Sequence, residues 1–366
     1  MLSGNVEQHL ADPFEELYGL LERDTQQLQA RNCERQTTGE LSMVDIYNKD
    51  QFREALGKLE ERDPRYCLYE GLLATPNTKS LAKVTTEMLI KLEQLKKSFP
   101  NFEQVTSDIK EILELEFMGD CKTIKIPPVL LSGPPGIGKT RYLNELSKIL
   151  NVGEVRQIDV ASASAGFIIG GNSTKWKDGG QGLVTKHLQE SECANPMVLL
   201  DEIDKPANNG HNPLGSLFNL LERHTAETFT DEALELPMNC SNIIWFATAN
   251  SLDDIPGPIK SRFDIYHVEM PSPQQMRNVI DSVYGELLSN NDWGISFSSS
   301  LSHAVVTELN SRSPRDLYKA LWKACAKAVQ RDRCYINKMS GLIDLLPIDF
   351  GQYQYQYEPK QAIGFY

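Results

Sequence analysis

The sequence predicts an α/β fold, in which a parallel sheet is flanked by helices and followed by a small helical domain, with a helical N-terminal region. Three observations support this prediction. Four short apolar runs alternate with segments of helical spacing within residues 121–270. After Pro271 the strand-like runs stop and helical patterns follow. Before the sheet, residues 79–120 show helical spacing that is interrupted at Pro100.

The four apolar runs are the expected strands. Each is short and is separated from the next by a stretch long enough for a crossover helix. They cover residues 129–131, 156–160, 197–200 and 243–247. Strands connected in this way lie parallel, so their carboxyl ends meet at one edge of the sheet.

The rest of the chain is expected to be helical. Beyond the sheet, helices are predicted at 274–288, 301–309 and 315–330, the last with one apolar stripe. We therefore expect five parts: a helical N-terminal region of unknown role at 1–78, a helical lead-in at 79–120, an α/β domain at 121–270, a helical lid domain at 271–345 and a tail at 346–366.

Composition excludes several classes of protein. The formal net charge of -13 opposes sequence-independent binding to nucleic acid, which needs a basic surface. The seven cysteines are odd in number, scattered and never spaced as C-x-x-C, which argues against a disulfide framework or a zinc site and favours the reducing cytoplasm. No apolar run approaches the roughly 18 residues needed to cross a bilayer, so we expect no membrane insertion.

Residues 133–140 fit the phosphate-binding pattern G-x-x-x-x-G-K-[ST], between an apolar strand and an expected helix. Glycines let the backbone N–H groups surround phosphate oxygens, and the positive end of the helix favours the same anion. Lys139 would neutralise the β- and γ-phosphates of ATP, and the Thr140 hydroxyl would bind Mg²⁺. A chance Gly-Pro turn is the alternative. The candidate nucleotide-binding residues are Gly133, Pro134, Pro135, Gly136, Ile137, Gly138, Lys139 and Thr140.

A second candidate element is the acidic pair Asp201 and Glu202, which ends the third apolar strand. This places two carboxylates at the sheet edge beside the phosphate-binding loop. Asp201 would hold Mg²⁺ through water, and Glu202 would polarise the attacking water. Taken alone, such a pair is usually the N-cap of a helix. The preceding phosphate-binding motif favours the catalytic interpretation.

Three further polar residues are candidates for catalysis. Asn250 ends the fourth strand, where its amide could orient the attacking water, although a turn-forming Asn is the alternative. Arg262 follows a Pro-Gly-Pro turn and could reach the nucleotide of an adjacent subunit, or form a surface salt bridge. Arg315 begins a helix after Ser313-Pro314, which would aim its side chain predictably, unless it is simply solvated.

Taken together, residues 127–330 resemble the AAA+ module of the Lon proteases. The resemblance is carried, in the same order and spacing, by residues 133–140, 195–205, 247–251 and 255–258. It implies that Lys139 and Thr140 form Walker A, that Asp201 and Glu202 form Walker B, that Asn250 is sensor 1, that Arg262 is the arginine finger and that Arg315 is sensor 2. It also implies a hexameric ring with ATP between subunits.

Two departures from the family matter. Lon proteases continue past the lid into a serine-lysine peptidase domain, whereas 36 residues follow Gln330 here, too few for an independent domain of usual size. We therefore expect no protease activity of the chain's own. Residues 1–78 also show no resemblance to the family's substrate-binding N-domain, and the substrate could be specified there.

A candidate pore loop lies at Phe167 and Ile168, flanked by glycines. The resemblance places there a loop that grips a threaded polypeptide, and glycines permit the flexing that gripping requires. A buried strand over residues 167–169 is the alternative, because short apolar runs are ambiguous. Trp176 could belong to the same axial surface or pack on the sheet.

These observations predict a cytoplasmic, ring-forming ATP hydrolase, with ATP and Mg²⁺ as cofactors, that remodels or translocates a macromolecule. Net acidity and the apolar loop favour protein as the substrate. Two alternatives stay open: a nucleic-acid motor or loader, which DNA would stimulate, and a slowly hydrolysing scaffold that docks an effector protein.

Overall fold

The computed structural model describes residues 43–161, 165–176, 179–205, 214–333 and 341–351. Most of the expected tail and the first 42 residues of the expected N-terminal region lie outside the described residues. Contacts divide the chain into residues 1–43 and residues 44–366, and the central sheet with its flanking helices belongs to the second unit.

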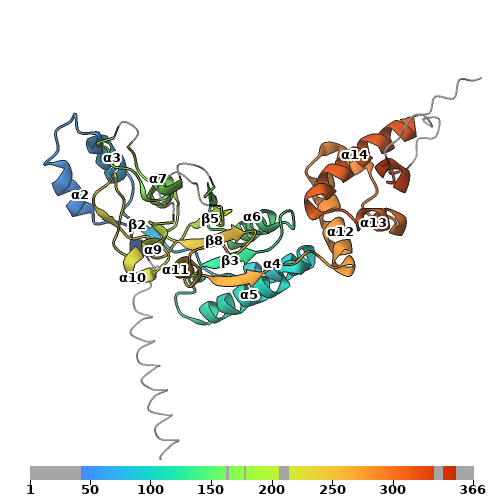
Figure 1. Ribbon diagram of the computed structural model, residues 1–366, viewed down its shortest axis with the longest axis horizontal. Coiled ribbons are helices and arrows are strands. Elements are labelled where there is room, and N and C mark those ends of the chain that lie inside the picture. The colour runs from blue at the N-terminus through green and yellow to red at the C-terminus, as the bar shows by residue number, and fades with distance from the viewer. Residues whose placement is uncertain (1–42, 162–164, 177–178, 206–213, 334–340, 352–366) are drawn as a thin grey trace, which may run out of the picture. The chain divides into compact units, whose positions relative to one another are not determined.

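A five-stranded, all-parallel sheet forms the centre of this unit, in the order β4-β5-β8-β3-β9 (Figure 1). The predicted α/β fold with a parallel sheet is confirmed. Four strands are those expected: β3 (Val129–Ser132), β4 (Arg156–Asp159), β5 (Met197–Asp201) and β8 (Ile244–Ala249).

The fifth strand, β9 (Asp264–His267), was not predicted. It pairs with β3 at the edge of the sheet, and three of its four residues are exposed. Because an edge strand with a polar face lacks the apolar run of a central strand, its sequence carried no strand pattern.

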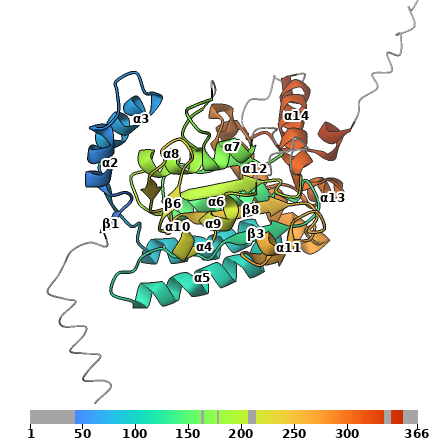
Figure 2. The ribbon, with the colours of Figure 1, turned by 60° about the vertical axis from the view of Figure 1, so that its left-hand side comes forward.

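Each face of the sheet has its own hydrophobic core, since alternate residues of a strand point to opposite faces. Val129 and Leu131 pack on one face, whereas Leu130 packs on the other. The first core includes α4 (Thr86–Ser98), the 3-10 turn η1 (Pro100–Phe102), α5 (Glu103–Met118) and α6 (Lys139–Leu150). The second includes α2 (Lys49–Leu56), α3 (Pro64–Leu73), α7 (Ala165–Gly170), α8 (Leu183–Glu190), α9 (Leu217–Leu220) and α11 (Gly257–Lys260) (Figure 2).

The described part of the N-terminal region shares that second core. Phe52 and Tyr69 are buried there, with ring centroids 5.1 Å apart, and the Tyr69 hydroxyl donates to the carbonyl of Leu234, 2.5 Å away. The short strands β1 (Met43–Asp45), β2 (Thr78–Ser80), β6 (Phe229–Thr230) and β7 (Pro237–Met238) and the turn helix α10 (Arg223–Ala226) complete this side. Residues 44–80 are therefore built onto the sheet domain by long-range contacts.

Three helices after Pro271 form a separate core, as the sequence predicted. They are α12 (Pro273–Ser289), α13 (His303–Leu309) and α14 (Pro314–Arg333), with the 3-10 turns η2 (Asp292–Ser296) and η3 (Pro347–Phe350) packed beside them. Ser272 starts α12 with a capping box, in which its side chain and that of Gln275 each accept a backbone N–H. Within the described part of the chain, no helix is both long and apolar enough to cross a membrane.

Candidate active site

The phosphate-binding loop leaves β3 and enters α6 through three glycines with distinct constraints. Gly136 and Gly138 have φ of 84° and 100°, a region that L side chains rarely adopt. A Cβ on Gly133 would lie 2.1 Å from the carbonyl oxygen of Val268, so the loop and the end of β9 touch there. A loop that curls through such glycine conformations can direct backbone N–H groups at a phosphate.

Lys139, the first residue of α6, is only 9% exposed, and its ammonium group lies at the carboxyl edge of the sheet. Its Nζ donates to the carbonyl of Gly133 at 2.6 Å and to Oδ1 of Asn250 at 3.2 Å. Burial lowers the pKa of Lys139, while the carboxylates of Asp204, Asp201 and Glu202 act in the opposite direction. A buried ammonium group with neutral oxygen partners suits an anionic ligand, which would replace those partners.

Thr248 organises the acidic pair at the end of β5. Its hydroxyl donates to Oδ1 of Asp201 and accepts the backbone N–H of Glu202 at 3.1 Å. Oδ2 of Asp201 accepts from Gln157 at 2.9 Å. Glu202 has a φ of 54°, unusual for a side-chain residue, and pairs with Lys205 at 3.0 Å. The two carboxylates thus leave the strand with fixed and different orientations.

Asp204 holds the end of the neighbouring strand β8, a role that the sequence did not suggest. It is 6% exposed, and its Oδ2 accepts the backbone N–H groups of Asn250 at 3.0 Å and Ser251 at 3.1 Å. These bonds fix the backbone at Asn250, whose side chain faces Lys139.

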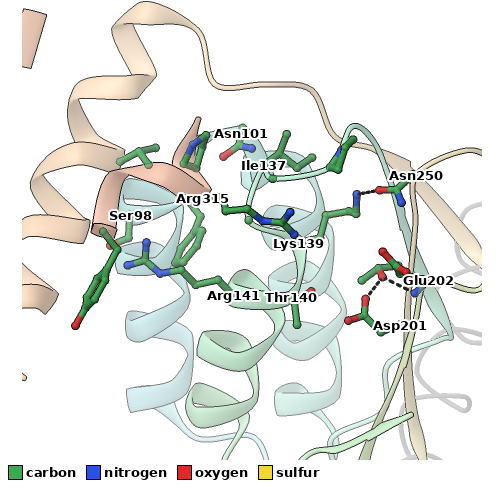
Figure 3. A pocket seen from close by; sticks show the side chains of 18 of the residues that line it. Ser98, Asn101, Ile137, Lys139, Thr140, Arg141, Asp201, Glu202, Asn250 and Arg315 are labelled. Carbon is green, nitrogen blue, oxygen red and sulfur yellow. Dashed lines mark hydrogen bonds between the residues drawn. The ribbon is translucent and has the colours of Figure 1, made fainter. Parts of the chain in front are cut away.

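The predicted site residues meet in a pocket of about 430 Å³ between the sheet edge and the lid helices (Figure 3). The lid is joined to the loop directly, because the backbone N–H of Arg315 donates to the carbonyl of Gly136 at 3.2 Å. Among the residues that line the pocket are Pro135, Gly136, Ile137, Gly138, Lys139, Thr140, Asp201, Glu202, Asn250 and Arg315. Thr140 and Asp201 supply the oxygen ligands that Mg²⁺ prefers. The residues present therefore fit a magnesium-bound nucleotide.

Arg262 does not join this group. Its guanidinium lies 5.3 Å from the ring centre of Phe218 and pairs with Glu222 at 2.5 Å. It also donates to the carbonyl of Pro258, and its buried Nε has no partner among the described residues. The side chain is 21% exposed and firmly held.

The candidate pore-loop residues Phe167 and Ile168 lie in the short helix α7, so the buried strand that was the alternative is not present there. Phe167 is 37% exposed, Ile168 is half-buried and Ile169 is fully buried. The physical reason is local: residues 165–170 pack the Ile169 side of a helical turn onto the second core. After α7, a backbone bridge between Asn172 and Gly180 precedes α8.

The segment around that bridge is anchored by Asp231, which is fully buried. Asp231 accepts the backbone N–H of Gly182 at 2.8 Å and the hydroxyl of Thr185 at 2.6 Å. A Cβ on Gly171 would lie 2.2 Å from Oδ1 of Asp231, so only glycine fits there. Burial raises the pKa of Asp231, while these hydrogen bonds act in the opposite direction. Trp176, between the bridged residues, is 70% exposed.

Comparison with known proteins agrees with this geometry. Residues 129–270 match the model of the ATPase family associated with various cellular activities, AAA. The chain is 30% identical over 224 residues to a Lon protease of Amoebophilus asiaticus, 31% over 204 residues to one of Bacillus thuringiensis, and 34% over 162 residues to a mitochondrial Lon protease homolog of Eremothecium gossypii. These alignments cover 60%, 54% and 43% of this chain, and 27%, 25% and 15% of the relatives.

The chain thus spans about a quarter or less of the length of these relatives. The family match over residues 129–270 includes the phosphate-binding loop, the acidic pair and Asn250. Residues 129–270 of the chain are thus similar to an AAA ATPase module, and the relatives named above that share this similarity are Lon proteases.

Proposed function

We propose that this chain is one subunit of a ring in which ATP bound to one subunit is hydrolysed with the help of Arg262 from the next. The observation that supports this proposal is the position of Arg262 outside the nucleotide pocket. In the described part of the chain, Lys139 and Arg315 line the nucleotide pocket and Arg262 does not. Phe218 and Glu222 hold the Arg262 guanidinium elsewhere. A firmly held arginine outside its own pocket suits a site that two subunits share.

Within that shared site each residue has a proposed task. Lys139 and the loop N–H groups bind phosphate, and Thr140 and Asp201 hold Mg²⁺. Glu202 polarises the attacking water, and Asn250, fixed by Asp204, orients it. Arg315 senses the nucleotide from the lid. Six subunits is the number that the resemblance to Lon implies.

Arg262→Ala tests the shared site. This variant should bind ATP as the unmodified chain does but hydrolyse it about 10³-fold more slowly, because an arginine finger stabilises transition-state charge. Mixed with Lys139→Ala subunits it should regain activity, since some interfaces then combine an intact pocket with an intact Arg262. Arg223→Ala, on the neighbouring α10, is the matched control. If no mixture of the two variants recovers ATPase activity, the shared-site model is wrong. Light scattering measures the number of subunits in the ring.

We propose protein as the substrate that this ring moves. Trp176 and Phe167 offer exposed aromatic surface on a segment anchored to the sheet domain by Asp231, and aromatic groups can contact any polypeptide. The relatives are named proteases, and proteases act on proteins. The net charge of -13 works against nucleic acid. Scattered cysteines support the cytoplasm as its location.

Substrate-stimulated ATPase activity separates the possible substrates. Trp176→Ala and Phe167→Ala should keep basal turnover and lose stimulation by an unfolded protein, because these side chains lie outside the nucleotide pocket. Leu115→Ala, at an apolar residue on α5 that is as exposed as Trp176, is the control. Stimulation by DNA alone would favour a nucleic-acid motor, and very low turnover released by one partner would favour a scaffold.

A further inference from the structure

Arg141 connects three parts of the chain at the rim of the nucleotide pocket. It lies in the first turn of α6, directly after Thr140. Its guanidinium forms an ion pair with Glu286 of the lid helix α12 and lies 5.5 Å from the ring centre of Phe99, in the lead-in. Sequence analysis singled out none of these three residues.

The ion pair stands where the nucleotide would bind. Arg141 and Glu286 both line the nucleotide pocket, and Figure 3 shows Arg141 on the side of the pocket that also holds Arg315. The same two residues line a neighbouring pocket, between α4, α6 and α12. The pair therefore forms part of the boundary between the two pockets.

Charge makes Glu286 unusual among the carboxylates of this pocket. Asp201 and Glu202 lie at the sheet edge, where a magnesium ion and the attacking water would offset or use their charge. Glu286 comes from the lid, and its charge is offset by Arg141. The negative charges of a bound triphosphate would compete with this carboxylate for the Arg141 guanidinium.

Breaking the Arg141–Glu286 ion pair should cost little free energy. The two side chains are 31% and 39% exposed, and ion pairs that water reaches contribute little stability. A guanidinium binds phosphate through two parallel N–H groups, which is stronger than a solvated pairing with one carboxylate. The ring of Phe99 can support the guanidinium in either position, because stacking on an aromatic face does not depend on the anion.

We propose that Glu286 competes with the nucleotide phosphates for Arg141. Without nucleotide, the Arg141–Glu286 pair links α12 of the lid to α6. When nucleotide binds, Arg141 turns to the phosphates and this link between lid and sheet domain is released. Arg141 is thus a further nucleotide-binding residue, and Glu286 weakens binding. The inference rests on nucleotide binding in this pocket and does not depend on ring formation.

Calorimetric titration of the full chain with Mg-ATP tests this competition, which predicts that Glu286→Gln raises the affinity for ATP. Glu286→Gln should bind ATP about fivefold more tightly, because Arg141 no longer has to leave a carboxylate. Arg141→Gln should bind about tenfold more weakly, and the double variant should match Arg141→Gln, since Glu286 acts only through Arg141. Glu145→Gln, which removes an equal charge from α6 outside the nucleotide pocket, should change nothing.

Weaker or unchanged binding by Glu286→Gln would overturn the competition, because a carboxylate that merely clamps the lid has no reason to oppose ATP. So would a double variant that differs from Arg141→Gln. If Arg141→Gln fails to melt cooperatively, Arg141→Lys replaces it, with intermediate affinity expected because Lys lacks the planar fork. Absence of any ATP binding by the unmodified chain would refute the nucleotide pocket itself, which distinguishes that failure from failure of the competition.

Discussion

Thr248→Val removes one hydroxyl on which the geometry of the whole acidic pair depends. Thr248 is 1% exposed, and its hydroxyl bonds to both Asp201 and the backbone of Glu202. Valine has nearly the same shape, so no cavity forms and the change isolates the hydrogen bonds. Thr248→Ser is the matched control, because it keeps the hydroxyl and loses only a methyl group.

The expected cost follows from the two bonds. A hydrogen bond to a charged carboxylate contributes about 1.5–3 kcal/mol and a neutral one about 1 kcal/mol, so Thr248→Val should lower the free energy of unfolding by about 3 kcal/mol. Thr248→Ser should cost about 1 kcal/mol, for one buried methyl group. Turnover should fall about 10- to 100-fold in Thr248→Val, because Asp201 loses the donor that orients it toward Mg²⁺, and by less than about threefold in Thr248→Ser.

Urea denaturation and steady-state ATPase assays measure the two effects separately. The reasoning fails if Thr248→Val is as stable and as active as the unmodified chain. It also fails if Thr248→Ser is damaged equally, since the methyl group and not the hydroxyl would then matter.

Two further predictions concern the site and the pH dependence of stability. Glu202→Gln should retain ATP and lose about 10²-fold or more in turnover, because general-base help is lost while phosphate binding is spared; unchanged turnover would remove Glu202 from the mechanism. Burial lowers the pKa of His187, with Arg156 adding to the effect. The unfolded chain then takes up a proton near about pH 6.5 that the folded chain does not. Stability should be full above that pH and fall as the pH drops through the folded pKa, and urea titrations of His187→Gln should show a flatter profile between about pH 5 and 7.

The phosphate-binding loop could be predicted because its functional residues are contiguous in the sequence. Residues 133–140 carry the glycines, lysine and hydroxyl together, and the strand and helix on either side confirm their setting. The acidic pair and Asn250 could be predicted for a related reason, since each follows directly after a buried strand of a parallel sheet.

Other parts of the site depend on contacts between distant residues, which no local pattern records. Arg141 and Glu286 are 145 residues apart and meet only because the lid packs above α6. Thr248 lies in the segment 247–251 that carries the resemblance to Lon. Its hydrogen bonds to Asp201 and Glu202, however, depend on the pairing of β5 with β8, which the sequence does not show. The roles of the site residues, including Arg262, Arg315, Phe167 and Ile168, stay predictions, and Arg262→Ala and Phe167→Ala test two of them.

The anchoring of Trp176 by Asp231 has a mechanical consequence. If a polypeptide pulled on the exposed indole, the load would pass along the backbone to Gly171, where Asp231 fills the space that a side chain would occupy. The bonds from Gly182 and Thr185 to one carboxylate then share the strain. Since Asp231 directly follows β6, such a load would reach the sheet domain through this one buried carboxylate.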